Sequence, residues 1–429
     1  MLYRNYTEEL IGLKDICVKF IERNDDLLKI HISMFKRIHK CPRCRESTSK
    51  VHDYRTHAIK DITAFGEKTI IYLRKRRHVC PLCNKKFYEN VSFLPKHHRM
   101  TNRLIAYVIN SLKEVRSIKN VAESANISQT TAARIFDIIE YSNTTLPKVF
   151  SIDEFRGNAG GEKFQCILTN PEHKRVLDIL PNRKTEDLAG YFLKFKDRKN
   201  VDHVVIDMSG PFKSLAKSLF PKAKIIADRY HVVRQVIWAF ENVRKAEQQK
   251  FHASRRRYFK RSRKILLKRP ERLTEEEPSQ VEAMLRISDR LRQAYRMKNE
   301  FHKFMDCKNR DEVRKQLGIW NMMAVGYALP EFEACTKTFI NWHEEILNSF
   351  EYPYSNGYTE GVNNKIKVIK RNAYGVRNFK RFRNRILHAM PMDRKHILIQ
   401  QKSADCLAIT CRENIQLFHF TWGSPQHLT

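Results

Sequence analysis

Apolar runs in the middle of the chain predict a small α/β layer. Turn signals such as Asn170-Pro171 separate these runs, which are short enough for strands. The expected strands cover residues 149–153, 163–169, 175–180, 201–208 and 223–227. An amphipathic helix is expected over 185–196, and the order β-β-β-α-β-α-β predicts a mixed sheet in an α/β domain.

Helical periodicity dominates on both sides of this layer. A helical stretch is expected over 100–142, and Pro147 marks the linker that ends it, because proline restricts the residue before it. A long helical region is expected over 231–350, with a break at 275–278, and a further helix over 359–371. Nearer the N-terminus, the alternating run 28–34 predicts a strand.

The charge balance points to a polyanionic partner. The 429 residues include 81 Lys and Arg against 47 Asp and Glu, a net charge of +34. Nucleic acid is the commonest such partner; an anionic membrane surface, or solubility alone, are the alternatives. No apolar run approaches the roughly 18 residues of a membrane span, and residues 1–23 lack the features of a signal peptide, so we expect a cytoplasmic protein.

Two Cys-x-x-Cys pairs predict one structural zinc ion. Cys41 with Cys44, and Cys80 with Cys83, each supply two thiolates from one tight turn, and four ligands leave no open coordination position. A zinc ribbon joined by the strand-like run 68–73 fits this spacing. A redox pair or free buried thiols are the alternatives. Other candidate ligands nearby are His52, His57 and His78, and the basic run 74–77 is interpreted as either a phosphate contact or a solvated strand edge.

Residues 117–135 have the sequence pattern of a helix-turn-helix. Val121 and Ala122 would face inward, Asn126 would take the left-handed turn, and Ser128 would cap the second helix. The exposed start of that helix, which would enter a major groove, carries Gln129, Thr130, Ala133 and Arg134. An ordinary helical hairpin is the alternative.

Three acidic residues occupy positions where an ionised carboxylate is costly unless a cation or a hydrogen-bond donor lies beside it. Asp153 and Asp207 each close an apolar strand, and Glu360 opens a basic helix. Buried charges are unstable unless they are paired or bound to metal, and carboxylates suit Mg²⁺. Two ions about 3.5–4 Å apart stabilise the attacking and leaving oxygens of a phosphoryl displacement. Competing acids are Glu154, Asp178, Asp202 and Asp228.

Four segments make the chain similar to a known family. They are SIDEF at 151–155, VIDMSGPF at 205–212, ADRYHVVR at 227–234 and SNGYTEGVNNKIK at 355–367. Together they resemble the ISL-three-type transposases of bacterial insertion sequences, and the likeness extends over the zinc ribbon and the helix-turn-helix. The last segment is the most specific of the four.

The resemblance implies a fold and a catalytic triad. The fold would be a ribonuclease-H-like α/β catalytic domain with a large helical insertion, preceded by the zinc ribbon and the helix-turn-helix domain. The DDE triad falls on Asp153, Asp207 and Glu360. Asp228 and His231 resemble a supporting acid-x-x-His element, with a purely structural role as the equal alternative. The expected cofactors are two Mg²⁺ or Mn²⁺ ions and one Zn²⁺.

The resemblance also implies the domain order and the partners. The expected parts are residues 1–95 with the zinc ribbon, 100–143 with the helix-turn-helix, 148–231 and 351–395 as the catalytic domain, 232–350 as a basic helical insertion, and a tail over 396–429 with no assigned role. The partner is double-stranded DNA, at the terminal inverted repeats of the element and at the target, in the bacterial nucleoid. A homodimer is expected because two ends must be brought together.

Further DNA contacts are expected outside the helix-turn-helix. Sequence-independent phosphate contacts are predicted for Arg255, Arg256, Lys365, Lys367, Lys370 and Arg371, with a solvated helix face as the alternative. The expected reaction is Mg²⁺-dependent strand cleavage followed by strand transfer. The alternatives are a catalytically silent DNA-binding protein of the same architecture and a structure-selective or RNA-directed nuclease of the same fold.

Overall fold

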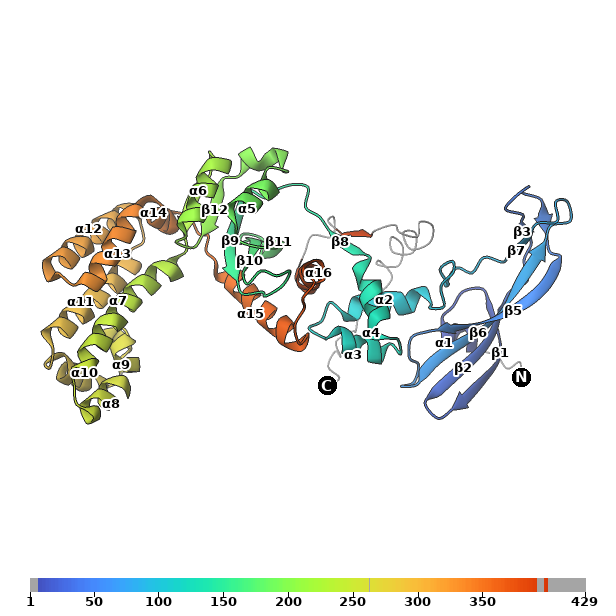
Figure 1. Cartoon of the computed structure of the whole chain (residues 1–429), viewed down its shortest axis with the longest axis horizontal. Coiled ribbons are helices and arrows are strands. Elements are labelled where there is room, and N and C mark those ends of the chain that lie inside the picture. The colour runs from blue at the N-terminus through green and yellow to red at the C-terminus, as the bar shows by residue number, and fades with distance from the viewer. Residues whose placement is uncertain (1–6, 262, 392–396, 400–429) are drawn as a thin grey trace, which may run out of the picture.

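The N-terminal part of the chain is a twisted sheet that carries two cysteine turns at one end. The computed structural model describes residues 7–261, 263–391 and 397–399, arranged along one long axis (Figure 1). The first sheet has the strand order β1-β2-β6-β5, with β7 also paired to β6. Its elements are α1 (Thr7–Ile11), β1 (Ile16–Asn24), β2 (Leu27–Met34), β5 (Val51–Lys60), β6 (Lys68–Val79) and β7 (Lys86–Tyr88).

Alternation along β6 buries one face of this sheet, with Ile71 and Leu73 in its core. The expected strand over 28–34 is confirmed as β2. The basic run 74–77 pairs with β5 along its length, whereas on its other side the pairing with β2 ends at Leu73 and that with β7 begins at Arg77, so the run is a strand edge only in part, with Arg74 exposed. Within that run Arg76 is buried and donates to the carboxylate of Glu89 at 3.0 Å, so this side chain is held inside the protein rather than offered to phosphate.

Three short helices follow the sheet. They are α2 (Asn102–Ser111), α3 (Ile118–Ser124) and α4 (Gln129–Asp137). The expectation of helix as far as residue 142 is wrong, because α4 ends at Asp137 and residues Ile139–Tyr141 form the strand β8. β8 pairs antiparallel with β14 (Ile397–Ile399), a partner more than 250 residues away that local periodicity does not reveal.

The central sheet confirms the predicted strand and helix order. Its strand order is β11-β10-β9-β12-β13, antiparallel from β11 to β9 and parallel from β9 to β13. The elements are β9 (Val149–Phe155), β10 (Gln165–Asn170), β11 (Arg175–Leu180), α5 (Thr185–Phe192), the 3₁₀ turn η1 (Lys196–Asn200), β12 (His203–Ile206), α6 (Gly210–Leu219) and β13 (Lys224–Ala227). The sheet is therefore mixed, as the sequence predicted.

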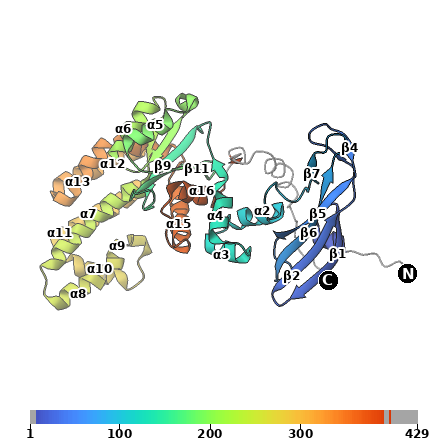
Figure 2. The ribbon, with the colours of Figure 1, turned by 45° about the vertical axis from the view of Figure 1, so that its right-hand side comes forward.

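Helices cover both faces of the central sheet (Figures 1 and 2). On one face α5 and α6 pack through Phe192 and Phe220 against Phe150 of β9, with ring centroids 5.1–5.5 Å apart. The other face receives α15 (Gly357–Asn372) and α16 (Phe379–Ala389) through an apolar cluster that includes Ile366 and Ile386. Because strand side chains alternate, Phe150 and Ile152 face α5 and α6, whereas Ser151 and Asp153 face α15.

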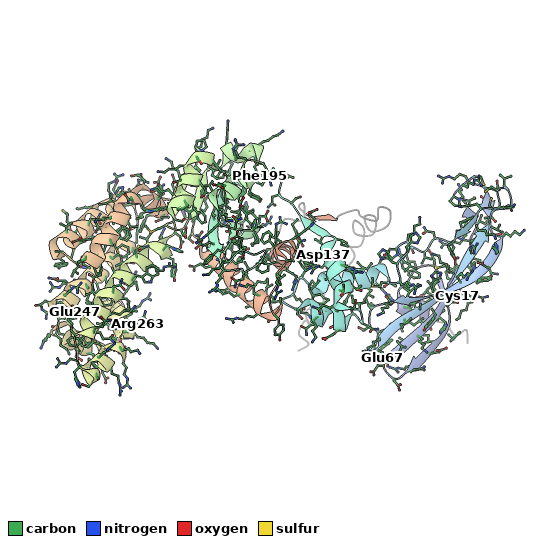
Figure 3. All side chains as sticks on the ribbon, viewed as in Figure 1. Cys17, Glu67, Asp137, Phe195, Glu247 and Arg263 are labelled. Atoms are coloured by element: carbon green, nitrogen blue, oxygen red, sulfur yellow. The ribbon has the colours of Figure 1, made fainter. Side chains whose placement is uncertain are left out.

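A helical insertion connects β13 to α15. Its elements are α7 (Arg229–Gln249), α8 (Ala253–Arg261), α9 (Arg263–Leu267), η2 (Pro270–Arg272), α10 (Glu277–Leu285), α11 (Asp289–Met305), α12 (Arg310–Tyr327), α13 (Pro330–Asn341) and α14 (His343–Glu351). The expected break at 275–278 is only partly correct, because α10 begins at Glu277 with a proline in its first turn. Arg263 reaches Glu241 of α7 at 2.6 Å and helps to fold α9 back on α7 (Figure 3).

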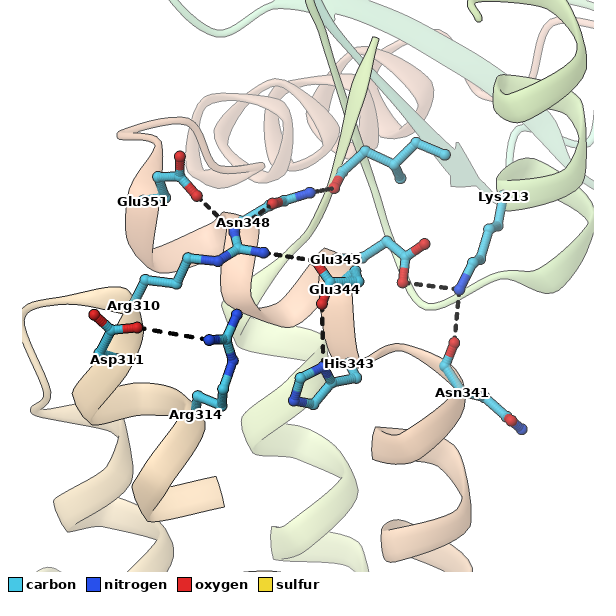
Figure 4. A network of polar contacts seen from close by, with 11 residues as sticks. Lys213, Arg310, Asp311, Arg314, Asn341, His343, Glu344, Glu345, Asn348 and Glu351 are labelled. Carbon is cyan, nitrogen blue, oxygen red and sulfur yellow. Dashed lines mark hydrogen bonds and ion pairs between the residues drawn. The ribbon is translucent and has the colours of Figure 1, made fainter. Parts of the chain in front are cut away.

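The insertion is joined to the central sheet by buried contacts. One apolar cluster runs from the α5–α6 face of the sheet into the insertion. Asn348 of α14 donates to the carbonyl of Ile225 in β13 at 2.8 Å and accepts from Arg310 at 2.9 Å (Figure 4). Lys213 of α6 pairs with Glu345 at 2.8 Å. The insertion is thus packed against the sheet rather than tethered to it. None of the described helices is both long and apolar enough to span a bilayer.

Candidate active site and zinc centre

Three acids lie at the same end of three adjacent parallel strands. Ile152 of β9 pairs with Ile206 of β12, so Asp153 and Asp207 follow at equivalent positions. On the other side of β12, Ala227 pairs with Ile206, and the amide of Asp228 donates to the Ile206 carbonyl at 2.9 Å. The sheet register therefore brings the three carboxylates to one edge.

Helix α15 brings Glu360 to the same edge. The amide of Asn356, just before the helix, donates to Asp228 Oδ1 at 3.1 Å, and Asn363 Nδ2 donates to Asp153 Oδ2 at 2.9 Å. Glu360 is four residues after Asn356 and three before Asn363, so it shares their face of the helix. These two bonds hold the first turns of α15, which carry Glu360, against Asp153 and Asp228, and the Glu360 side chain is exposed.

A buried hydroxyl cluster fixes α15 on the sheet. Thr359 Oγ1 lies 2.9 Å from Ser151 Oγ of β9 and 2.7 Å from Thr169 Oγ1 of β10. The two strand hydroxyls are themselves 2.6 Å apart, and all three residues are fully buried. Because Thr359 directly precedes Glu360, these bonds set the position of that carboxylate along the sheet.

The acids perturb one another electrostatically. Burial raises the pKa of Asp153 to about 6, and the charge of Asp228 adds to the shift. Burial likewise raises the pKa of Asp207 to about 7, with Asp153 as the next cause. The pKa of Glu360 is raised by burial and then by Asp228. A cluster of carboxylates that repel one another is favourable only if protons or cations are bound.

The donor set of this cluster suits a divalent cation. Asp207 Oδ1 and Asp228 Oδ2 are buried and have no hydrogen-bond partner. Carboxylate oxygens are the ligands that Mg²⁺ and Mn²⁺ prefer. The three triad acids are not among the groups of three ligand atoms that lie within 4.8 Å of one another in the described part of the chain. They are thus neighbours that do not converge on a single point.

The competing acids have other partners or other positions. Glu154 is held by Arg183 through contacts of 2.7 and 3.0 Å. Asp178 is buried against Arg383 at 2.6 Å. Asp202 is exposed and precedes β12, at the end of the strand opposite to the acid cluster. These environments leave Asp153, Asp207, Asp228 and Glu360 as the acids at this edge that are linked to one another by electrostatic interactions.

Asp228 and His231 lie where α7 begins. Asp228 is 4% exposed, and its charge acts on both Asp153 and Glu360. The amide of His231 donates to the Asp228 carbonyl at 3.0 Å, and burial lowers the pKa of the imidazole. The neutral form of His231 is therefore favoured at neutral pH.

The four cysteines form one cluster, as predicted. Cys44 Sγ lies 3.4 Å from Cys80 Sγ and 3.5 Å from Cys83 Sγ, and Cys41 Sγ lies 3.6 Å from Cys83 Sγ. Four thiolates about 2.3 Å from one zinc ion would stand about 3.8 Å apart, so the cluster fits a single tetrahedral ion.

Both cysteine pairs lie in equivalent turns. The amide of Arg45 donates to the Cys41 carbonyl at 2.9 Å, and that of Asn84 donates to the Cys80 carbonyl at 3.1 Å. Arg45 and Asn84 both adopt a left-handed conformation, with φ of 66° and 54°. The two cysteine loops therefore have the same backbone conformation.

None of the three predicted alternative histidine ligands belongs to the cysteine cluster. His78 is buried and forms a separate group with His39 and Glu89, in which Glu89 is already held by Arg76. His52 is exposed and His57 is half-buried.

The helix-turn-helix geometry is confirmed. Val121 and Ala122 are buried, Asn126 takes a left-handed φ of 50°, and Ser128 Oγ accepts from the amide of Thr131 at 3.1 Å. The side chains of Gln129, Thr130 and Arg134 are exposed on α4, whereas Ala133 is buried and was wrongly included among the exposed positions.

The predicted phosphate contacts divide into two kinds. Lys365 donates to the carbonyl of Ala389, and Lys370 to that of Arg156, each at 2.5 Å, so both ammonium groups serve the fold. Lys367 and Arg371 are exposed on α15. Further exposed cations on α8 are Arg255 and Arg256.

Sequence reasoning missed the positioning residues Asn356, Asn363 and Thr359. Part of the signal was present in the segment 355–367, because Asn363 lies one helical turn after Glu360, whereas the contact of Asn356 is made by its backbone amide and leaves no mark in the sequence. It could not be recognised without knowing that the first turns of this helix pack across the ends of β9 and β13.

Comparisons with known proteins agree with this architecture. Residues 150–386, more than half of the chain, match the family described as "Transposase". Residues 89–137 match "Helix-turn-helix domain of transposase family ISL3", and residues 37–83 match "zinc-finger of transposase IS204/IS1001/IS1096/IS1165". A mixed sheet with this acid cluster, behind a zinc ribbon and a helix-turn-helix, defines a DNA transposase of the DDE type.

The chain belongs to the ISL3 family of insertion-sequence transposases. It is 25% identical over 407 residues to the transposase for insertion sequence element IS1001 of Bordetella parapertussis, a match that covers 91% of this chain and 99% of that protein. A shorter match, 36% identical over 108 residues, is to a protein described as an ATP-dependent protease of Lactococcus lactis subsp. lactis, and covers a third of that protein.

Proposed function

We propose that Asp153, Asp207 and Glu360 are the catalytic acids with which this transposase cuts and joins DNA at the ends of its insertion sequence. The observation that carries the proposal is the pair of bonds from Asn363 to Asp153 and from the Asn356 amide to Asp228, which hold the turn that carries Glu360 against the strand-end acids. Asp228 and His231 are proposed to support the site by adding negative charge and a neutral imidazole beside it.

The mechanism follows from where these residues hold charge. When bound, a pair of Mg²⁺ or Mn²⁺ ions would activate the attacking oxygen and stabilise the leaving oxygen of an in-line displacement. Asp153 and Asp207 would hold the ions jointly, and Glu360 would complete one of the two ligand sets. Asn363 keeps the Asp153 carboxylate oriented through its hydrogen bond.

The proposed reaction has two steps at one site. In the first, water attacks a phosphodiester at the end of the element, which frees a 3′-hydroxyl on the element and leaves a 5′-phosphate on the flanking strand. In the second, that hydroxyl attacks a phosphodiester of the target, joins the element to the target 5′ end and releases the 3′-hydroxyl of the cut target strand. Positioning and charge stabilisation supply most of the rate enhancement in such displacements, because little covalent chemistry is asked of the protein.

The finer features of the fold are part of the same proposal. A strand order of three antiparallel strands followed by two parallel ones supports a ribonuclease-H-like domain, made of residues 148–231 and 351–395 around the insertion 232–350. The sheet and helices ahead of it support the division into a zinc-ribbon part, 1–95, and a helix-turn-helix part, 100–143. The predicted tail over 396–429 lies outside the described residues apart from β14.

We also infer the DNA partners from the same surfaces. Exposed Gln129, Thr130 and Arg134 are proposed to read the terminal inverted repeats, and the exposed cations of α8 and α15 to contact phosphates. Two ends must meet for strand transfer, so a homodimer is proposed as the active assembly, acting on nucleoid DNA in the bacterial cytoplasm.

Cleavage of end-containing DNA tests the catalytic assignment. Asp207→Asn should abolish nicking of a plasmid that carries the element's own ends in Mg²⁺ or Mn²⁺, while binding to the same DNA stays within about two-fold of wild type. The control is Asp202→Asn, at the opposite end of β12, which should nick normally. Nicking retained by Asp207→Asn would overturn the assignment, and a wild-type protein that binds without nicking would favour the silent DNA-binding alternative.

A further inference from the structure

Two exposed aromatic side chains and a half-buried arginine form a stripe on the first turns of α7. Tyr230, Arg234 and Trp238 are spaced by four residues, so they share one face of the helix. The opposite face is the one that packs into the core, through Val232, Val236, Ala239 and Val243. The stripe is therefore not required for the packing of α7.

Both rings of the stripe are exposed to solvent. Trp238 is 51% exposed and Tyr230 is 55% exposed. The other two tryptophans in the described part of the chain, Trp320 and Trp342, are 1% and 6% exposed. The guanidinium of Arg234 lies over the Trp238 ring, 4.3 Å from its centroid. Large rings left in water are more typical of binding surfaces than of packing positions.

This stripe begins at the acid cluster. α7 starts directly after Asp228, and the Tyr230 ring lies 5.5 Å from that of His231. Burial raises the pKa of Asp207, while the positive charge of Arg234 works in the opposite direction, so Arg234 is within electrostatic reach of that acid. DNA held at the acids would thus pass the stripe.

Aromatic faces beside a phosphodiester site suit one kind of ligand. Nucleobases stack on tyrosine and tryptophan rings, and arginine adds a cation–π contact. Bases inside a duplex are already stacked on their neighbours, so only an unpaired base offers its face. We propose that Tyr230, Arg234 and Trp238 form a stacking surface for an unpaired nucleobase of the DNA strand held at the acids. This inference rests on the proposed function in taking DNA as the substrate and the acids as the place where its strand is held.

Binding to defined DNA tests the stacking surface without requiring cleavage. The probes are two duplexes of equal length and charge, one with a single unpaired thymine and one with an abasic sugar at the same place. The full-length wild-type protein should bind the thymine duplex about ten-fold more tightly. Trp238→Ala should remove that preference, and Trp238→Phe should keep part of it. Met322→Ala, which removes an exposed apolar side chain from α12, should behave as wild type.

The outcomes separate this inference from the catalytic proposal. Asp207→Asn should keep the thymine preference even though it no longer cuts. A wild-type protein that nicks DNA but binds both duplexes equally would overturn the stacking surface alone. A Trp238→Ala variant that keeps the preference would also overturn it. If Trp238→Ala keeps the preference but changes the oligomeric state in light scattering, the stacking surface is likewise overturned. Trp238 would then contact a second copy of the chain instead of a base.

Discussion

At the scale of single residues, Asp207 is the proposed catalytic acid whose ionised form is least favoured by its surroundings. Its Oδ1 is buried without a hydrogen-bond partner, and its pKa is raised to about 7 by burial and by Asp153. The folded protein therefore holds a proton there that the unfolded chain, with an ordinary carboxyl pKa near 3.8, has already released at neutral pH. The stability that this proton represents is present below about pH 4 and is lost as the pH rises through about 7.

Asp207→Asn is accordingly expected to stabilise the metal-free protein at pH 8. The gain should be about 1–2 kcal/mol, less than the pKa shift alone implies, because solvent screens part of the repulsion. The measurement is thermal unfolding in a chelator at pH 5 and at pH 8. The gain should be smaller at pH 5 than at pH 8, because the wild-type protein loses this stability progressively as the pH rises from about 4 to about 7. An equal gain at both pH values would contradict the account of Asp207 as a buried carboxyl that resists ionisation.

The sequence identified the acids but not the residues that orient them. Asp153 and Asp207 could be recognised because a carboxylate at the end of an apolar strand has few structural uses. Asn363 and Ser151 could not, because an asparagine or serine has many uses and its partner here lies more than 200 residues away. Lys365 shows the converse, since its charge suggested DNA while its ammonium group binds a carbonyl of α16.

At the scale of elements, the position of α15 depends on a cluster of three hydroxyls. Thr359→Val removes the shared partner of Ser151 and Thr169, which remain bonded to each other, so the loss of stability should be about 1 kcal/mol. The rate of nicking should fall by about ten- to a hundred-fold, more than this loss of stability would cause, because Glu360 moves with the helix. The assays are thermal unfolding and plasmid nicking.

The matched control for Thr359→Val is Thr338→Val on α13. Its hydroxyl donates an ordinary hydrogen bond to the Ala334 carbonyl on the helix surface at 2.9 Å, and α13 carries none of the acids. Thr338→Val should leave nicking unchanged. If the two valine variants nick equally well, the hydroxyl cluster does not position Glu360.

The zinc ribbon gives a second prediction at this scale. The purified protein should carry one zinc per chain by elemental analysis, and Cys80→Ser should lose it, because the ion needs all four thiolates. Cys307→Ser, which changes a cysteine of the insertion outside the cluster, should keep its zinc. Normal zinc content in Cys80→Ser would refute the single four-thiolate site.

The strands and helices followed from local pattern wherever their partners were local. β11 has the predicted bounds, and β9, β12 and β13 differ from prediction by a few residues. β8 was missed because its pairing partner among the described strands is β14, more than 250 residues away. The pairing of the basic run with β5 was missed for a similar reason, since alternation tells which side chains are buried but not which strands lie beside a strand.

At the scale of the whole molecule, the +34 charge is distributed over an elongated chain with exposed cations on α4, α8 and α15. DNA affinity should therefore depend steeply on salt. A loss of about 10³-fold or more between about 50 and 200 mM salt is expected if about six or more phosphates are neutralised. Replacing Lys367 and Arg371 together by glutamine should reduce the slope by about two. A flat salt response would contradict phosphate contacts as the main source of affinity.

Manganese binding at equilibrium tests most directly whether the three acids make one site. Free Mn²⁺ can be counted by electron paramagnetic resonance in titrations of the wild-type protein, of Asp153→Asn, Asp207→Asn and Glu360→Gln, and of the control Asp202→Asn. Each of the three triad variants should bind Mn²⁺ at least about ten-fold more weakly than wild type, and the control should bind as wild type does. Wild-type affinity in any triad variant, or an equal loss in Asp202→Asn, would contradict a shared metal site at Asp153, Asp207 and Glu360.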